Sequence, residues 1–239
     1  MGEFFELPFT KEYIKYNDMM LRYMSAVLGA LGEDKFDDPE IEKEQREHLS
    51  AIGRRFLRSA ELTMALTADR SNINMTVINL GEFMSEFAQK CSAAADCKAN
   101  IRKGKTVNKV VKTEKNFVIY ILLGFIRHTL SLIKSDSADF TIECGCPEDG
   151  NAYIHLKCDS ACGSDGSNKY ASELFDKYTL EMCELLAKRI GAECVIDNTS
   201  LKLIFISDNK EYDIHFESGV VTPVGSEFSP YEMMLSDII

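Results

Sequence analysis

The chain has 239 residues, of which 45% are hydrophobic and 27% charged, and its formal net charge is −11. This length is enough for one large domain or two modest ones with an ample core. The negative charge argues against nucleic acid and against an anionic membrane surface as partners, because phosphate recognition needs a basic surface. No apolar run in the sequence reaches the roughly 20 residues that span a bilayer, so we expect no membrane insertion.

Two long amphipathic helices are predicted at the start of the chain. Thr10–Leu31 carries tyrosine, methionine and other apolar residues at steps of three and four. Asp38 is suited to cap a second helix over Pro39–Ala68, whose apolar residues also keep a near-heptad spacing. Two such helices joined by a short turn form an antiparallel hairpin. One hairpin leaves its apolar stripe half covered, so residues 1–70 predict a dimerisation domain that forms a four-helix bundle in a homodimer.

After residue 70 the pattern mixes strands with helices. We expect strands at Ile73–Val77, Cys97–Lys103, Thr106–Val111, Phe140–Cys144, Tyr153–Cys158, Cys194–Ile196 and Leu201–Ile206. We expect helices at Leu80–Ala95, Asn116–Ile133 and Ser172–Ile190. This mixture predicts an α+β sandwich over residues 71–206, with one mixed sheet covered by helices.

The helix expected at Asn116–Ile133 is apolar nearly all the way round, which is typical of a helix packed on several sides. Its interruptions fall on a single face, at Gly124, Arg127, His128 and Ser131. A buried helix with one polar face usually turns it toward a cavity, a ligand or a partner. The alternative is a core helix whose Arg127 and His128 reach solvent or are satisfied locally.

The order of these elements resembles that of the two-component sensor histidine kinases, over about residues 10–206. DRSNINMTVINLGEF (Asp69–Phe83) looks like their junction between dimerisation hairpin and ATPase domain, and LLGFIRHTLSLI looks like the helix that carries their N box. LKCDSACG (Leu156–Gly163) looks like the first glycine box, and YTLEMCELLAKRIGAE (Tyr178–Glu193) is similar to the helix after the second. The resemblance implies a helical hairpin followed by a histidine-kinase-like ATPase domain.

The resemblance also implies a site for ATP and Mg²⁺ on the N-box helix. In that box, asparagines on one helical face ligate Mg²⁺ and reach the phosphates. The matching positions here are Gly124 and His128. His128 is thereby the candidate metal ligand, although imidazole is a poor substitute for amide oxygen around Mg²⁺. Arg127 on the same face could attract phosphate.

The glycine boxes supply the rest of the implied nucleotide site. Asp159 matches the aspartate that accepts a hydrogen bond from the adenine amino group, Ala161 replaces the first glycine, and Gly163 keeps the second. The glycines of the second box let the backbone at a helix N-terminus approach phosphate. Lys177 and Thr179 stand at those positions, so their side chains should block that approach.

The phosphoacceptor departs furthest from the family pattern. The family places a histidine followed by an acidic residue on its first hairpin helix, but residues 10–32 contain no histidine. His48, followed by Leu49 on the second helix, is the one candidate in the hairpin; its other interpretation is a histidine at the edge of the bundle stripe.

These departures predict a histidine-kinase-like signalling protein with decayed ATP-binding and phosphoacceptor sites, acting as a dimeric regulator or scaffold. Its partner would be a response regulator or another signalling protein. The alternatives are an active ATP-dependent sensor histidine kinase, a histidine phosphotransferase with a degenerate ATPase domain, and an ATPase fold that binds another small ligand.

The eight cysteines lack the C-x-x-C spacing of structural zinc sites. If 138–146 and 151–159 form a hairpin, Cys158 pairs near Asp139, far from Cys144, which also argues against a metal site. We therefore expect reduced thiols in a cytoplasmic protein.

Residues 207–239 extend beyond the family pattern. An extra strand is expected at Tyr212–Phe216, followed by a short apolar helix or extended tail in PYEMMLSDII. This tail either packs on its own domain or binds a partner or a second copy of the chain. If exposed, its apolar residues would form a sizeable patch, made of Met233, Met234, Leu235, Ile238 and Ile239.

Overall fold

The computed structural model describes residues 39–67, 73–94, 98–133, 137–147, 150–160, 174–206 and 229–235, and residues 15, 18–19, 21–23 and 25–26 of the N-terminal segment. The elements follow in the order α3 (Pro39–Thr67), β1 (Thr76–Asn79), α4 (Leu80–Ala94), β2 (Ala99–Lys103), β3 (Val110–Thr113), α5 (Lys115–Leu132), β4 (Ala138–Gly145), β5 (Ala152–Cys158), α6 (Leu174–Arg189), β6 (Ala192–Ile196), β7 (Ser200–Phe205) and α7 (Pro230–Leu235). None of the helices in this described part of the chain has the length and hydropathy needed to span a bilayer.

Five strands form one mixed sheet in the order β2-β4-β5-β7-β6. β2 runs parallel to β4, and the other neighbours are antiparallel. The predicted α+β class with a mixed sheet is confirmed. The predicted hairpin register is also close, since Cys158 pairs with Phe140 while Cys144 pairs with Ile154.

The strand expected at Thr106–Val111 was placed too early and belongs to a separate ladder. β3 begins at Val110 and pairs with β1 in a two-stranded antiparallel sheet. Val110 lies opposite Asn79 and Val111 opposite Ile78. The ladder therefore includes the two β-branched valines that end the expected strand and leaves out the more polar residues that begin it.

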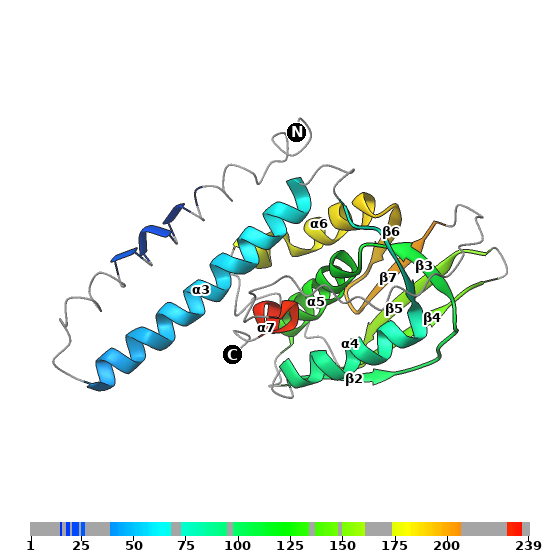
Figure 1. Cartoon of the computed structure of the whole chain (residues 1–239). Coiled ribbons are helices and arrows are strands. Elements are labelled where there is room, and N and C mark those ends of the chain that lie inside the picture. The colour runs from blue at the N-terminus through cyan, green and yellow to red at the C-terminus, as the bar shows by residue number, and fades with distance from the viewer. Residues whose placement is uncertain are drawn as a thin grey trace.

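The helices α4, α5 and α6 lie over one face of the five-stranded sheet (Figure 1). Alternate residues of β4 point into this interface, with Phe140 and Ile142 fully buried, while Thr141 between them is only partly buried. β5 alternates in the same way, with Ile154, Leu156 and Cys158 buried. α5 is buried around almost its whole surface, because α6 and α7 also pack on it.

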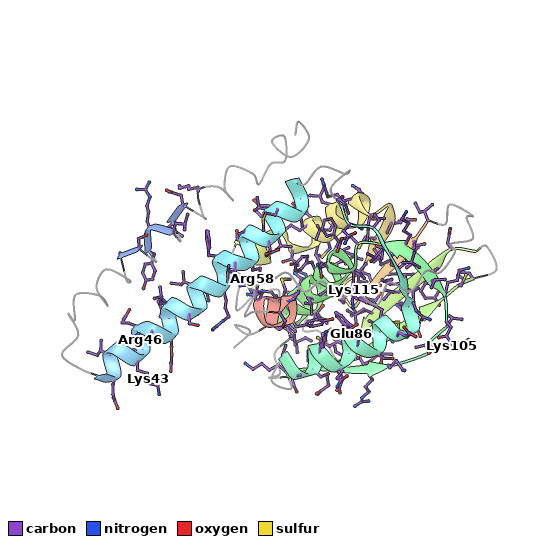
Figure 2. All side chains as sticks on the ribbon, in the orientation of Figure 1. Lys43, Arg46, Arg58, Glu86, Lys105 and Lys115 are labelled. Atoms are coloured by element: carbon purple, nitrogen blue, oxygen red, sulfur yellow. The ribbon has the colours of Figure 1, made fainter. Side chains whose placement is uncertain are left out.

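An ion-pair cluster fixes the start of α5 against α4. The Lys115 Nζ atom lies 2.7 Å from Glu86 Oε2 (Figure 2). The Lys90 Nζ atom lies 2.7 Å from Glu86 Oε1. Burial alone would raise the pKa of Glu86, but the hydrogen bonds from the two lysines outweigh it and hold this pKa below its usual value.

The long helix α3 ends against the same core. Its observed bounds, Pro39–Thr67, match the predicted helix closely. The first half extends away from the sheet and helices, whereas the last turns reach α5, α6 and α7 (Figure 1). The Tyr120 hydroxyl donates to Glu61 Oε2 at 3.4 Å, and Arg189 Nη1 donates to the Leu66 carbonyl at 2.8 Å. The C-terminal half of α3 therefore belongs to the packed core.

The first predicted helix, Thr10–Leu31, falls mostly outside the described residues. Where the backbone is described between residues 15 and 26, it is helical. The Tyr23 ring lies edge-on to His48 of α3, with 5.6 Å between ring centroids. The antiparallel hairpin and its four-helix bundle stay predictions.

The turn between β6 and β7 is organised by one carboxylate. Asp197 Oδ1 accepts hydrogen bonds from the backbone N–H groups of Thr199 and Ser200, each at 2.7 Å. The Ser200 hydroxyl donates to Asp197 Oδ2 at 2.8 Å. These bonds, led by the one from the Thr199 backbone, lower the pKa of Asp197.

Replacing Asp197 by asparagine is expected to weaken the fold at neutral pH and to reduce its sensitivity to acid. Because the folded pKa lies below the unfolded value, the stabilisation is present above the unfolded pKa and is lost as the pH falls through the folded one. Solvent screens this exposed group, so we expect less than about 1 kcal/mol. Urea midpoints measured from neutral to acid pH test this. The exposed variant Glu193→Gln serves as control, and an equal acid response in wild type and Asp197→Asn would contradict it.

Candidate functional site

The candidate site begins with the polar face of α5. Glu114 caps the helix by accepting a hydrogen bond from the Asn116 backbone at 3.1 Å, and the apolar run that follows buries the helix among its neighbours. The predicted bounds, Asn116–Ile133, differ by one residue at each end from the observed Lys115–Leu132.

At Gly124, α5 lies directly against α6. A Cβ atom built on Gly124 would lie 3.1 Å from Cys183 Sγ and 3.3 Å from Thr179 Cγ2. Cys183 Sγ also donates to the Ile121 carbonyl at 3.5 Å, one helical turn earlier on α5. The absence of a side chain at Gly124 allows this close approach of the two helices. At Gly124 the polar face of α5 therefore packs against two side chains of α6, Thr179 and Cys183.

Arg127 points toward the C-terminal helix. The residue is 4% exposed, and its Nη1 atom donates to the Met234 carbonyl of α7 at 3.1 Å. His128, the neighbouring candidate, is partly buried, and its carbonyl accepts the Ser131 hydroxyl at 2.6 Å. Arg127 is thus engaged by a segment more than a hundred residues away in the sequence.

Asp159 lies on the opposite face of the sheet from α5. Its Oδ2 atom accepts the Thr141 hydroxyl at 2.5 Å, and its Oδ1 atom lies 4.0 Å from Lys157 Nζ. Thr141 and Lys157 both point away from the helices, because the residues that alternate with them, such as Phe140 and Cys158, are buried beneath α4, α5 and α6. The inward position at the end of β5 is held by Cys158, so the structure does not bring Asp159 together with Gly124 or Arg127.

The remaining glycine-box positions are described in part. Ala161 and Gly163 lie outside the described residues. Lys177 is in the first half of α6, where only its backbone is described, and Thr179 is 1% exposed in the contact with α5.

Two of the histidines outside α5 have described surroundings. His48 is exposed on α3, next to the Tyr23 ring. His155 Nδ1 lies 3.1 Å from Glu143 Oε1 on the outer face of the sheet. His215 lies outside the described residues.

Sequence reasoning missed Arg58, which is 1% exposed on α3. Its Nη1 atom donates to the Met233 carbonyl of α7 at 2.8 Å. A signal was present, since Arg58 precedes Leu62 by four positions and Ala65 by seven, which places it inside the buried stripe of α3.

Most described cysteines are buried thiols. Burial raises the pKa of Cys91 to about 12 and that of Cys194 to about 12, and it raises the pKa of Cys183 well above its usual value. Among the residues that the structure describes, no group of three or more histidine, cysteine, aspartate or glutamate side chains is arranged to hold a metal ion.

In the native protein these three thiols are expected to resist alkylation by iodoacetamide at mildly alkaline pH, because the thiolate is the reactive form. Cys146, which is partly exposed, should be modified earlier. Peptide mapping by mass spectrometry before and after denaturation in urea tests this. Rapid native modification of Cys91 or Cys183 would contradict it.

Comparisons with known proteins support the fold. The sequence matches no family model and no curated protein sequence. The structure is similar to the histidine kinase AdeS from Acinetobacter baumannii, with a TM-score of 0.57 and 10% sequence identity over 80% of this chain and 96% of that one. Full-length ShkA, solved in complex with AMPPNP, gives a TM-score of 0.49 and 12% identity over 80% of this chain and 44% of ShkA. The cytoplasmic segment of histidine kinase QseC gives 0.44 and 10% identity over 65% of this chain and 93% of QseC. The likeness to AdeS shows that the chain has a histidine-kinase-like fold.

Proposed function

We propose that this chain is a histidine-kinase-like two-component signalling protein whose ATP-binding and phosphoacceptor sites have decayed, and that it acts as a dimeric regulator or scaffold. The observation that carries the proposal is the contact at Gly124. The family has a magnesium-binding asparagine at this position, whereas here Thr179 and Cys183 of α6 lie at van der Waals distance from it. A side chain at position 124 would press on Cys183 and Thr179, so an asparagine that holds a metal ion would require these two side chains to move.

The charged candidates support the same conclusion. Arg127 is held by the Met234 carbonyl, and Asp159 by Thr141 on the outer face of the sheet. A nucleotide site needs its phosphate-binding and adenine-binding groups to converge on one cavity. These two side chains lie on different sides of the sheet, so they do not form such a pair.

Isothermal titration of the full chain with ATP and ADP, with and without Mg²⁺, tests the proposal. We expect no heat of binding at millimolar nucleotide. Metal-dependent binding at micromolar affinity, lost on Asp159→Asn, would overturn it and favour an active kinase. An active histidine kinase titrated under the same conditions is the positive control.

The exposed position of His48 favours one second candidate, a histidine phosphotransferase with a degenerate ATPase domain. An accessible imidazole on a hairpin helix could accept a phosphoryl group from an external donor. Incubation with an acyl phosphate or a cognate kinase, followed by detection of acid-labile phosphate, tests this. Equal labelling of wild type and His48→Ala would exclude it.

The dimer in this proposal is supported by exposed apolar side chains at the N-terminal end of the molecule. Met19 is 58% exposed, Leu21 46% and Ile41 46%. Ile41 belongs to the apolar stripe predicted for the second helix, and exposed apolar side chains of this kind are suited to a contact with a partner. A second copy of the chain would cover them in a four-helix bundle. Its further partner would be a response regulator or another signalling protein.

Sedimentation equilibrium is expected to give about twice the 26.9 kDa chain mass. Ile41→Glu should weaken this dimer about tenfold or more, because it places a carboxylate in the apolar contact. Lys43→Glu introduces the same group on the exposed, charged side of α3 and should have little effect. A monomeric wild type, or an unchanged dimer in Ile41→Glu, would contradict the prediction.

A further inference from the structure

The C-terminal helix α7 is a short segment enclosed by three other helices. It packs against α3, α4 and α5 (Figure 1). Tyr231 is 4% exposed and Met234 1%, and the Tyr231 ring lies 5.7 Å from the Phe87 ring of α4. The apolar part of the tail, as far as Leu235, packs on its own chain and does not form an exposed patch; Ile238 and Ile239 lie outside the described residues.

Two buried arginines from different elements hold the end of this helix. Arg58 of α3 donates to the Met233 carbonyl at 2.8 Å, and Arg127 of α5 donates to the Met234 carbonyl at 3.1 Å. The last carbonyls of a helix have no partner within it and carry partial negative charge, which suits guanidinium donors. Figure 2 shows Arg58 where α3 passes α7, while Lys43 and Arg46 lie toward the other end of α3.

A helix of six residues does not form by itself in water. Its order in this structure therefore comes from its packing against α3, α4 and α5. Tyr231, Met233 and Met234 are buried in this contact, and two arginines donate to the last carbonyls. These are the properties of a helical peptide bound in a groove. Because α7 contacts α3 and α5 together, its presence also ties α3 to the helices over the sheet.

We propose that the groove between α3, α4 and α5 is a binding site for a short helical peptide, that its occupant is the chain's own segment 230–235, and that this occupancy holds the C-terminal half of α3 in place. The site does not depend on the proposed function, because nucleotide is not part of it. Binding within one chain is favoured by the high effective concentration of a tethered segment. Departure of the segment would free α3 to change its position.

The test uses the full chain with its own segment disabled. Tyr231→Gly and Met234→Gly together remove the apolar anchors without adding charge. Hydrogen exchange followed by mass spectrometry is expected to show faster exchange over residues 58–67 of α3 in this double variant than in wild type. A synthetic peptide with the sequence of residues 229–239 should restore slow exchange when added to the double variant. It should also bind the double variant about tenfold or more tightly than it binds wild type, whose groove is filled.

Point variants separate the arginine contacts from general loss of packing. Arg58→Met in the double-variant background should weaken peptide binding about tenfold. Arg46→Met makes the same change on an exposed position of α3 and should leave the affinity unchanged. Should the double variant fail to fold, the exchange of residues 58–67 and 230–235 in full-length Arg58→Met, compared with Arg46→Met, decides the matter. Equal peptide affinity for wild type and double variant, or α3 exchange unchanged by either set of substitutions, would overturn the proposal.

Discussion

Replacing Gly124 by asparagine is expected to lower the free energy of unfolding by about 2–4 kcal/mol and to create no nucleotide binding. The substitution introduces the residue type that histidine kinases carry at the corresponding position of their N box. Here, however, a Cβ atom would already lie 3.1 Å from Cys183 Sγ and 3.3 Å from Thr179 Cγ2, so the larger side chain must displace these two neighbours in a packed interface. The amide group of the asparagine would also be buried in an interface whose neighbouring side chains are not arranged to hydrogen-bond it. The helix-forming gain over glycine is only a few tenths of a kcal/mol and does not offset this cost.

Urea unfolding followed by circular dichroism measures the stability change, and titration with ATP and Mg²⁺ measures binding. Gly53→Asn on α3 is the matched control, because a Cβ at Gly53 meets no atom within 4 Å. That variant should keep wild-type stability within about 0.5 kcal/mol. If Gly124→Asn were as stable as wild type, or gained metal-dependent ATP binding, the proposal that the packing of α6 against Gly124 excludes a nucleotide site would be wrong.

Truncation of Leu62 to alanine is expected to cost about 2–5 kcal/mol and to destabilise α3 together with the sheet. Leu62 is 1% exposed and lies in the same apolar cluster as the inward residues of β4 and β5. The loss of its side chain leaves a cavity that the packed surroundings fill only in part. Because α3 and the sheet share this cluster, they should unfold in a single transition.

Circular dichroism reports the helices, and tyrosine fluorescence reports tertiary structure, since the chain has no tryptophan. Both signals should shift to lower urea by the same amount in Leu62→Ala. Met64→Ala, at a position that is 56% exposed on the same helix, should stay within about 0.5 kcal/mol of wild type. Separate transitions for the two signals, or equal effects of the two substitutions, would contradict a shared core.

Periodicity predicted the elements well where burial dictates residue type. The bounds of α5 were predicted within one residue at each end, because a long unbroken apolar run must be buried in the core. The bounds of α3 and α4 were predicted equally well from the sequence, since the apolar stripes of these helices are long. β1 and β3 were both misplaced, since β1 was expected at Ile73–Val77 but spans Thr76–Asn79. Their ladder is short, and a helix and a strand separate the two in the sequence.

The contacts made by the polar face of α5 could not be predicted from local sequence patterns. The sequence indicates that Arg127 shares a face with Gly124, but its partner is a backbone carbonyl on a segment that no periodicity connects to α5. Asp159 was different, because the alternation of Ile154, Leu156 and Cys158 carried the information that the next residue points outward. The motif resemblance matched residue types and gave no weight to that alternation.

The position of α7 has a consequence for the order in which the molecule is made. Arg58 and Met233 are 175 residues apart in the chain, and segments leave the ribosome from the N-terminus onward. α3, α4 and α5 are therefore complete long before the helix that covers them exists. Throughout that interval the apolar surfaces that α7 covers in the finished fold face water or other chains, and non-local contacts of this kind form slowly. The contact of α7 with α3, α4 and α5 can form only after synthesis has passed residue 235, so nascent chains are expected to depend on protection from aggregation until α7 emerges.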